Sequence, residues 1–213
     1  VAIALPGAGK DRLDAEDAAE AVIEGATLGL YRFDRYMSKS DEGDDDTGIS
    51  SITIMDADSS IKSALETGIT RGQIYADASL LARDLVNEPP NAMTPTDLAG
   101  AAERAAADSD GLTCTILERA AMEKMGMGAF LGVAQGSHEP PKLIRLEYVG
   151  DLDDAENNLW IIGKGITFDS GGLSLKPSMG MVTMKSDMAG GASIIGAIKA
   201  IAALAPAINV TGL

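Results

Sequence analysis

The sequence of 213 residues is poor in several residue types, and each shortage narrows the choice of fold and function. Aromatic residues make up only 4%, although 46% of the residues are hydrophobic, so aliphatic side chains and methionine must supply most of the core. This composition favours a helix-rich α/β protein over a sandwich with an aromatic core. The hydrophobic content is also too high for a disordered chain.

Cysteine and long apolar runs are nearly absent. The single cysteine, Cys114, excludes an internal disulfide framework and is typical of a reducing compartment. It lies in the apolar segment LTCTIL, so we expect a buried structural thiol. No run of 18 or more consecutive apolar residues occurs, so we expect no membrane-spanning helix.

Basic residues are also scarce, because 17 Lys and Arg face 32 Asp and Glu and leave a formal charge of −15. Such a surface repels phosphate backbones and anionic lipids, which disfavours binding to nucleic acids or membranes. Part of the acidic excess falls in SKSDEGDDDTG (38–48). Its residues 44–46 lack the ordered ligand spacing of a calcium loop, so we expect a solvated loop there.

The chain starts without Met at VAIALPGAGK and stops at PAINVTGL, inside an expected strand, so we expect a fragment truncated at both ends. Residues 14–30 and about 60–88 have the apolar periodicity of helices. The second helix must stop at the paired prolines of NEPPN. Thr94 then fits an N-cap, Pro95 the first helical position and Asp97 the first turn of a helix that runs to about 107.

Beyond residue 107 strands and helices alternate, which predicts an α/β fold with a mixed, mostly parallel sheet flanked by helices. The expected strands are 112–117, 129–134, 142–149, 159–163 and 207–213, with an earlier short strand at 51–55. The expected helices in this part of the chain are 118–125 and roughly 184–204.

The segments GKGITFDSGGLSLKP (163–177) and MKSDMAGGA (184–192) bring lysines, carboxylates and glycines together. Lys164 follows an expected strand directly, at the carboxyl edge where chemistry collects in α/β sheets. Asp169, Lys176 and Asp187 come after it within 23 residues. The intervening glycines allow tight turns and close approach to a ligand.

Two explanations of these segments fail. A phosphate-binding loop needs Ser or Thr after its lysine, but Lys164 is followed by Gly165. The tetrapeptide DSGG (169–172) matches the surroundings of the nucleophile in chymotrypsin-like proteases, which need a histidine base. The only histidine, His138, lies in a Pro-flanked polar segment, and those proteases are all-β, so we regard the match as coincidence.

The third explanation is a metal site without histidine. The carboxylates of Asp169 and Asp187 are hard oxygen ligands, and a carboxylate can bridge two divalent ions. A lysine amine binds a metal only when neutral, which costs about 4–5 kcal/mol at pH 7 from an ordinary pKa of about 10.4, and a bonded dication can supply that energy. From the spacing alone, ordinary surface ion pairs remain an equal alternative.

These two segments resemble the leucyl aminopeptidase family, also called the cytosol aminopeptidases. VNEPPNAMTPTDLA (86–99) and MGMGAFLGVAQGSHEPPKLIRLEY (125–148) resemble the same family, so the likeness covers at least residues 72–213. It is weaker over 1–66 and carries no catalytic motif there.

The resemblance implies three parts of the chain. Residues 1–66 would be the end of a truncated N-terminal domain with an α/β fold, and 67–90 a linking helix. Residues 91–213 would be the first half of the metallopeptidase catalytic domain.

The resemblance also implies a role for each site residue. Lys164 and Asp187 would ligate the tighter-held metal, and Asp169 would bridge both metals. Lys176 would be catalytic, staying cationic and stabilising the oxyanion of the scissile carbonyl. Met184 would line the pocket for the first side chain of the substrate, although core packing is the alternative for this residue. All five would contact the substrate.

The implied activity is that of a metal-dependent aminopeptidase, which uses two divalent ions (Mn or Zn) and activated water to release N-terminal residues. Its substrates would be peptides with a free N-terminus, and the full-length protein would be a cytoplasmic homohexamer without membrane or nucleic-acid partners. The family pattern continues with Asn-Thr-Asp-Ala-Glu-Gly-Arg, which supplies two more ligands and an arginine for bicarbonate. That motif is absent here, so we expect these 213 residues alone to be inactive or weakly active.

The alternative function is that of a non-catalytic homologue, or a binding module that retains the fold. A decayed site would be expected to lose ligands, whereas Lys164, Asp169, Lys176 and Asp187 are all present. The sequence therefore favours an enzyme.

Overall fold

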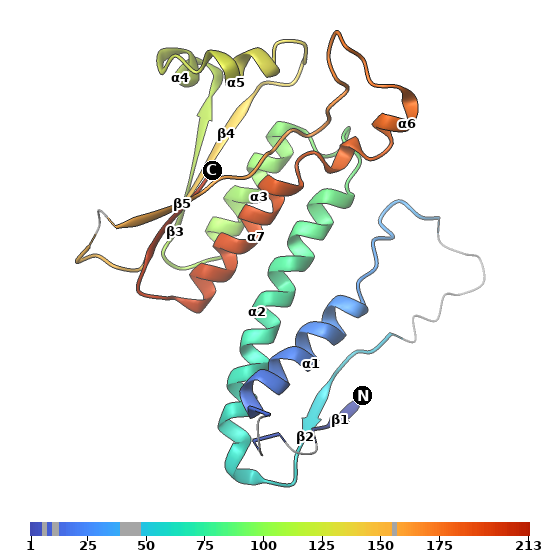
Figure 1. Ribbon diagram of the computed structural model, residues 1–213, viewed down its shortest axis with the longest axis vertical. Helices are drawn as coiled ribbons and strands as arrows, with labels where there is room; N and C mark the ends of the chain where they lie inside the picture. Colours follow the sequence, from blue (N-terminus) through green and yellow to red (C-terminus); the bar gives the residue numbers. More distant parts are fainter. Residues whose placement is uncertain (6–7, 10–12, 39–47, 155–156) are drawn as a thin grey trace. The chain divides into compact units, whose positions relative to one another are not determined.

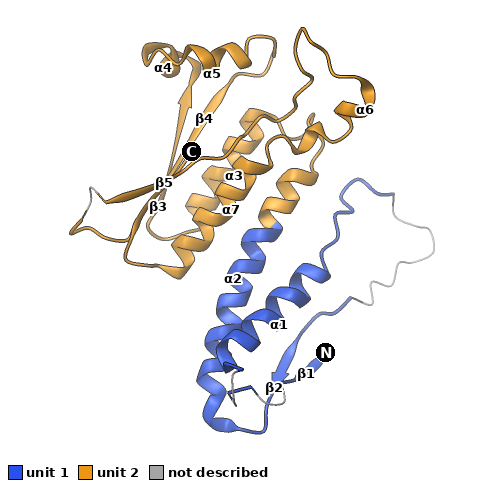
Figure 2. Ribbon diagram, viewed as in Figure 1, with its two compact units in different colours: residues 1–80 blue, residues 81–213 orange. Residues whose placement is uncertain are grey.

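A computed structural model describes the chain except for residues 6–7, 10–12, 39–47 and 155–156 (Figure 1). The acidic residues 44–46 lie outside the described part, so the solvated loop expected there stays a prediction. The described residues form two compact units, Val1–Leu80 and Leu81–Leu213 (Figure 2). The domain bounds expected at 66 and 90 also stay predictions.

The first unit joins two short parallel strands to two helices. Its elements are β1 (Ala2–Ala4), α1 (Ala15–Gly29), β2 (Thr53–Met55), the 3₁₀ turn η1 (Ser59–Ile61) and the first part of α2 (Lys62–Asn87). Asp14 caps α1 by accepting hydrogen bonds from the amides of Glu16 and Asp17. Alanines such as Ala15 and Ala19 pack in the core of this unit together with leucine and isoleucine side chains such as Leu65 and Ile54.

Two glycines allow α1 and α2 to touch backbone to backbone. Gly68 and Gly72 lie one helical turn apart on the same face of α2. A Cβ atom added at Gly68 would lie 2.1 Å from the carbonyl oxygen of Glu16, and one at Gly72 would lie 2.6 Å from that of Glu20. Arg71, between the two glycines, forms ion pairs with the side chains of Glu16 and Glu20. The glycines therefore determine how closely these helices approach.

The second unit packs two helices on a four-stranded sheet. Its elements are α3 (Pro95–Ala107), β3 (Leu112–Glu118), α4 (Arg119–Lys124), α5 (Gly128–Val133), β4 (Lys142–Val149), β5 (Asn158–Ile161), α6 (Ser178–Met181), the 3₁₀ turn η2 (Met184–Ser186), α7 (Ala189–Leu204) and β6 (Asn209–Gly212). The strand order is β3-β4-β6-β5. Helices α3 and α7 lie against the sheet, and their apolar faces form one core with it (Figure 1).

The α/β class and the mixed sheet are confirmed, but parallel pairing does not predominate in this sheet. Strands β5 and β6 are parallel because α7 crosses over between them. The β3–β4 and β4–β6 pairs are antiparallel. The short helices α4 and α5 lie beyond the ends of β3 and β4 in Figure 1, so this connection reverses the chain direction without crossing the sheet.

The strand expected at 129–134 is wrong, because Gly128–Val133 forms helix α5. The apolar run AFLGVA (129–134) is too short to show a clear period, so it fits a strand and a short helix equally well. The other strands and helices expected in this unit are confirmed to within a few residues, except that 184–188 precede α7 as the turn η2 and its connection.

The cap expected at the start of α3 is confirmed. The Thr94 hydroxyl accepts a hydrogen bond from the Asp97 amide (3.3 Å), and the Asp97 carboxylate accepts one from the Thr94 amide (3.0 Å). Hydrogen bonds from the Thr94 side chain and backbone hold the pKa of Asp97 below its usual range. This cap fixes where α3 begins, so that Leu98 and Ala102 face the core.

By length and composition alone, one stretch of the described residues could cross a membrane, namely Ser178–Leu204, with a mean hydropathy of 1.4. The structure divides this stretch into α6, η2 and α7. Ile195 and Ile198 of α7 are buried in the core of the second unit.

We predict that Gly68→Ala destabilises the chain by about 1–3 kcal/mol, because the new methyl group would collide with the Glu16 carbonyl. Gly25→Ala is the matched control, since Gly25 lies in α1 with nothing within 4 Å of an added Cβ. It should stabilise the chain by roughly 0.5–1 kcal/mol through helix propensity. Urea unfolding measures both changes, and equal effects of the two substitutions would contradict the backbone contact.

Cys114 packs against the core of the second unit, and burial raises the pKa of its thiol to about 11. At pH 8 roughly a thousandth of such a thiol is ionised, against about a quarter for a cysteine with an ordinary pKa near 8.5. We expect iodoacetamide to modify Cys114 at least tenfold more slowly than free cysteine. Unfolding the chain in urea should restore the ordinary rate, whereas equal rates in the native chain would show that the thiol is not protected.

Candidate metal centre

The backbone that carries Lys164 is fixed between strand β6 and helix α7. The Gly163 amide donates a hydrogen bond to the Leu213 carbonyl (2.8 Å), and the Lys164 carbonyl accepts one from the Gly191 amide (2.7 Å). A Cβ atom at Gly163 would lie 2.4 Å from the Gly190 carbonyl oxygen, so only glycine fits there. The loop after β5 is therefore held against the first turn of α7. The paired glycines of MAGGA were the only sequence signal of this contact.

Asp187 lies just before α7 and faces Lys164. The Lys164 amine is 3.1 Å from Asp187 Oδ2, and the side chains are 59% and 18% exposed, respectively. Although this distance is that of an ion pair, Oδ2 is buried and accepts no hydrogen bond from any residue that the structure describes. The N–H groups of the amine are misaligned with this oxygen, which leaves it poorly satisfied. A buried carboxylate oxygen in that state is one that a cation would stabilise.

A second ion pair joins the two ends of the loop 169–176. The Lys176 amine donates a hydrogen bond of 2.8 Å to Asp169 Oδ2, while the Gly171 amide donates one of 2.8 Å to Oδ1. Gly171 has φ +91°, and an added Cβ would lie 2.4 Å from the Ser174 carbonyl oxygen. The turn therefore requires glycine, and the turn brings Lys176 back to Asp169.

These contacts keep Asp169 ionised. The hydrogen bond from Lys176, then that from the Gly171 amide, and the positive charges of Lys176 and Lys164 hold the pKa of Asp169 below its usual range. The positive charge of Lys164, which faces Asp187, also acts in the direction that lowers the pKa of Asp169. Asp169 is thus an anion over the whole neutral range.

Met184, in η2, completes the group, since the Lys176 amine lies 2.9 Å from its sulfur. The structure therefore brings together all five residues singled out from the sequence, while their roles stay predictions. One further contact was not anticipated. Lys185, next to Met184, donates a hydrogen bond to the Asn87 carbonyl.

The donor set determines which ion could fit. Among the residues that the structure describes, no three His, Cys, Asp or Glu side chains lie together as metal ligands. The cluster offers two carboxylates, and its other donors are lysine amines. A mixed oxygen and nitrogen set of this kind suits Mn or Zn, provided that one amine gives up its proton.

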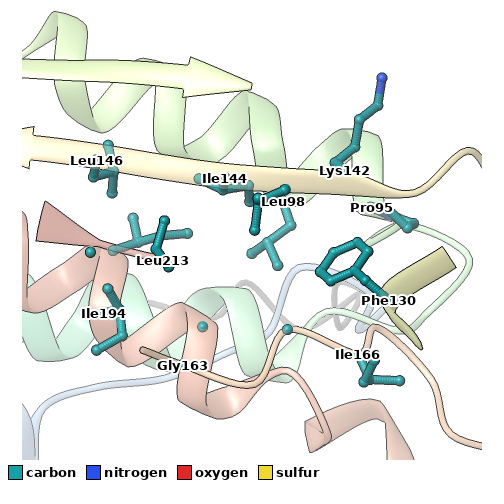
Figure 3. A pocket seen from close by; sticks show the side chains of 15 residues that line it. Pro95, Leu98, Phe130, Lys142, Ile144, Leu146, Gly163, Ile166, Ile194 and Leu213 are labelled. Carbon is teal, nitrogen blue, oxygen red and sulfur yellow. The ribbon is translucent and has the colours of Figure 1, made fainter. Parts of the chain in front are cut away.

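An apolar pocket adjoins the same loop but does not contain the cluster. Its volume is about 110 Å³, and Leu98, Phe130 and Ile166 are among its lining residues (Figure 3). Lys142 also lines it, but its amine points away in Figure 3 and is paired with Glu118 at 2.5 Å. None of the five cluster residues lines the pocket, so the charged chemistry lies outside it.

Models of two domains of one protein family match the chain. The model of the cytosol aminopeptidase family, catalytic domain, matches residues 80–213, and that of the N-terminal domain of the same family matches residues 1–40. The chain is 44% identical over 212 residues to a "Probable cytosol aminopeptidase" of Alkaliphilus oremlandii, covering 99% of this chain and 42% of the relative. It is 42% identical over 200 residues to the cytosol aminopeptidase of Pseudomonas aeruginosa, covering 94% and 39%.

A solved structure is similar over nearly the whole chain. It is the bottromycin maturation enzyme BotP in complex with Mn, with a TM-score of 0.82 and 34% identity, covering 99% of this chain and 42% of that one. The chain thus spans about two fifths of the length of the relatives that it matches. On the sequence match of both domains, the chain belongs to the cytosol aminopeptidase family.

Proposed function

We propose that this chain supplies part of the active site of a metal-dependent aminopeptidase, which releases the N-terminal residue of peptides. Membership of the family supports a peptidase. The main support for a metal is Asp187 Oδ2. This oxygen is buried, lies 3.1 Å from the Lys164 amine and accepts no hydrogen bond within the described part of the chain. The Mn in the complex of BotP adds support for a divalent ion.

In this proposal Lys164 and Asp187 hold one ion, and Asp169 contributes to that ion and to a second. Mn is the first candidate and Zn the second. Two bound divalent ions would supply Lewis-acid activation of water and of the scissile carbonyl. The lowered pKa of Asp169 keeps its carboxylate ionised, which is the state that binds a metal.

Lys176 has a different part, because it remains an ammonium held between the Asp169 carboxylate and the Met184 sulfur. A fixed positive charge beside the reacting carbonyl stabilises the negative charge that develops on its oxygen. Met184, held at the same amine, would contact the first side chain of the peptide. A free peptide N-terminus would be the group that distinguishes a substrate.

From the family resemblance we also propose three properties of the whole protein. They are a homohexameric assembly, a bicarbonate ion in the complete site, and a place in the cytoplasm. This chain, with only part of the family's ligand set, should by itself bind Mn²⁺ weakly and hydrolyse leucyl anilides poorly or not at all. Full turnover by these 213 residues would contradict that statement.

We predict that the affinity of this chain for Mn²⁺ rises with pH by up to about tenfold per unit between pH 6.5 and 8.5. The reason is that a lysine amine must release a proton before it binds a metal. Electron paramagnetic resonance of free Mn²⁺ measures the dissociation constant at each pH. In Lys164→Met the remaining carboxylates are already ionised, so the slope should vanish. A flat profile in the wild type would exclude the amine as a ligand.

A second prediction separates catalysis from metal binding. In the protein expressed from its whole reading frame, Lys176→Met should lower kcat for a leucyl anilide by about 10²–10³-fold, because one oxyanion-stabilising charge is lost. The metal content should stay unchanged. Lys124→Met, at an exposed position on α4, is the control and should leave kcat unchanged. Full activity of Lys176→Met would refute the catalytic role.

A further inference from the structure

The end of helix α2 has carbonyl groups that its own helix cannot satisfy. The last four carbonyls of any helix lack intrahelical donors. After Asn87, the chain continues with Glu88 and then Pro89 and Pro90, which have no N–H to donate. The Asn87 carbonyl accepts a hydrogen bond of 2.7 Å from the amine of the partly buried Lys185. This contact joins residues 98 positions apart in the sequence.

Lys185 is the middle residue of η2, a single 3₁₀ turn in which the Ser186 amide (2.9 Å) and hydroxyl (2.6 Å) donate hydrogen bonds to the Thr183 carbonyl. The turn has no side-chain cap, and the Asp187 amide reaches the Met184 carbonyl at a long 3.3 Å. Beyond it, Met188 is fully buried in the core. The segment is thus anchored on one side by Met188 and on the other by Lys185.

Residues on both sides of Lys185 in the sequence belong to the charged cluster. Met184 precedes Lys185 and contacts the Lys176 amine at 2.9 Å, and Asp187 follows it by two residues and faces the Lys164 amine at 3.1 Å. Because the turn is short, a shift of Lys185 would move both contacts.

We propose that Lys185 is a positioning residue for the metal centre. By binding the last carbonyl of α2, it holds the turn that carries Met184 and Asp187 in place opposite Lys176 and Lys164. This inference rests on the proposed function, because it assigns Lys185 a part in the same site.

If Lys185 only capped helix α2, a different experimental result would be expected. A lysine at a helix C-terminus stabilises the helix through the carbonyls and the helix dipole. That role alone would lower the stability of a variant without altering how the chain binds a metal.

The test compares Lys185→Met, Lys185→Arg and the exposed control Lys124→Met in this chain. We expect Lys185→Met to raise the dissociation constant for Mn²⁺ about tenfold, as loss of an outer support does at metal sites. Amide exchange over residues 184–188 should become faster. Lys185→Arg, which keeps a donor, should stay within about twofold of the wild type for Mn²⁺, and Lys124→Met should change neither measurement. If Lys185→Met does not fold, Lys185→Gln takes its place.

The outcomes distinguish a positioning role of Lys185 from a helix-capping role, and both from a failure of the metal site. A lower urea midpoint of Lys185→Met with unchanged Mn²⁺ affinity would reduce Lys185 to a helix cap and overturn the positioning role. Unchanged exchange at 184–188 would show that Lys185 does not anchor the turn. A wild-type chain that binds no Mn²⁺ would contradict the metal site proposed for these residues, and with it the positioning role, while the exchange result would still decide whether the turn is anchored.

Discussion

The contact between the Lys164 amine and the buried Asp187 oxygen is the interaction on which the account of this protein depends. Two groups of opposite charge lie 3.1 Å apart without hydrogen-bond geometry. An ordinary ion pair would be expected to close into a hydrogen bond, because the alignment costs little and satisfies the oxygen. Backbone hydrogen bonds hold the segments that carry these two residues close together.

Those backbone contacts explain the glycines of the two motifs. The close approach of Gly163 to Gly190 brings the loop after β5 against the start of α7. The positive φ of Gly171 returns the chain so that Lys176 reaches Asp169. The sheet provides the rigid edge, and the glycines determine how closely the charged side chains can gather there. The models of the catalytic and N-terminal domains of the cytosol aminopeptidase family both match this chain.

Much of this could be predicted from the sequence where a local signal determines the structure. Thr94 and Asp97 mark a helix start through their own hydrogen bonds, and paired prolines end α2 wherever the rest of the chain lies. The cluster residues could be named because their motif resembles a known family. The sequence did not predict the features that depend on contacts between residues far apart in the chain. The apolar run that forms α5 has no period, the antiparallel pairing of β4 depends on partners far along the chain, and nothing near Lys185 indicates Asn87.

The most direct test of the central claim is pulsed electron paramagnetic resonance of Mn²⁺ bound to this chain after labelling its lysines with ¹⁵N. If the Lys164 amine binds the metal, the spectrum will show a hyperfine coupling from a directly bonded ¹⁵N nucleus. This coupling should be lost in Lys164→Met. A spectrum of bound Mn²⁺ with oxygen ligands alone, unchanged by that substitution, would contradict this role of Lys164.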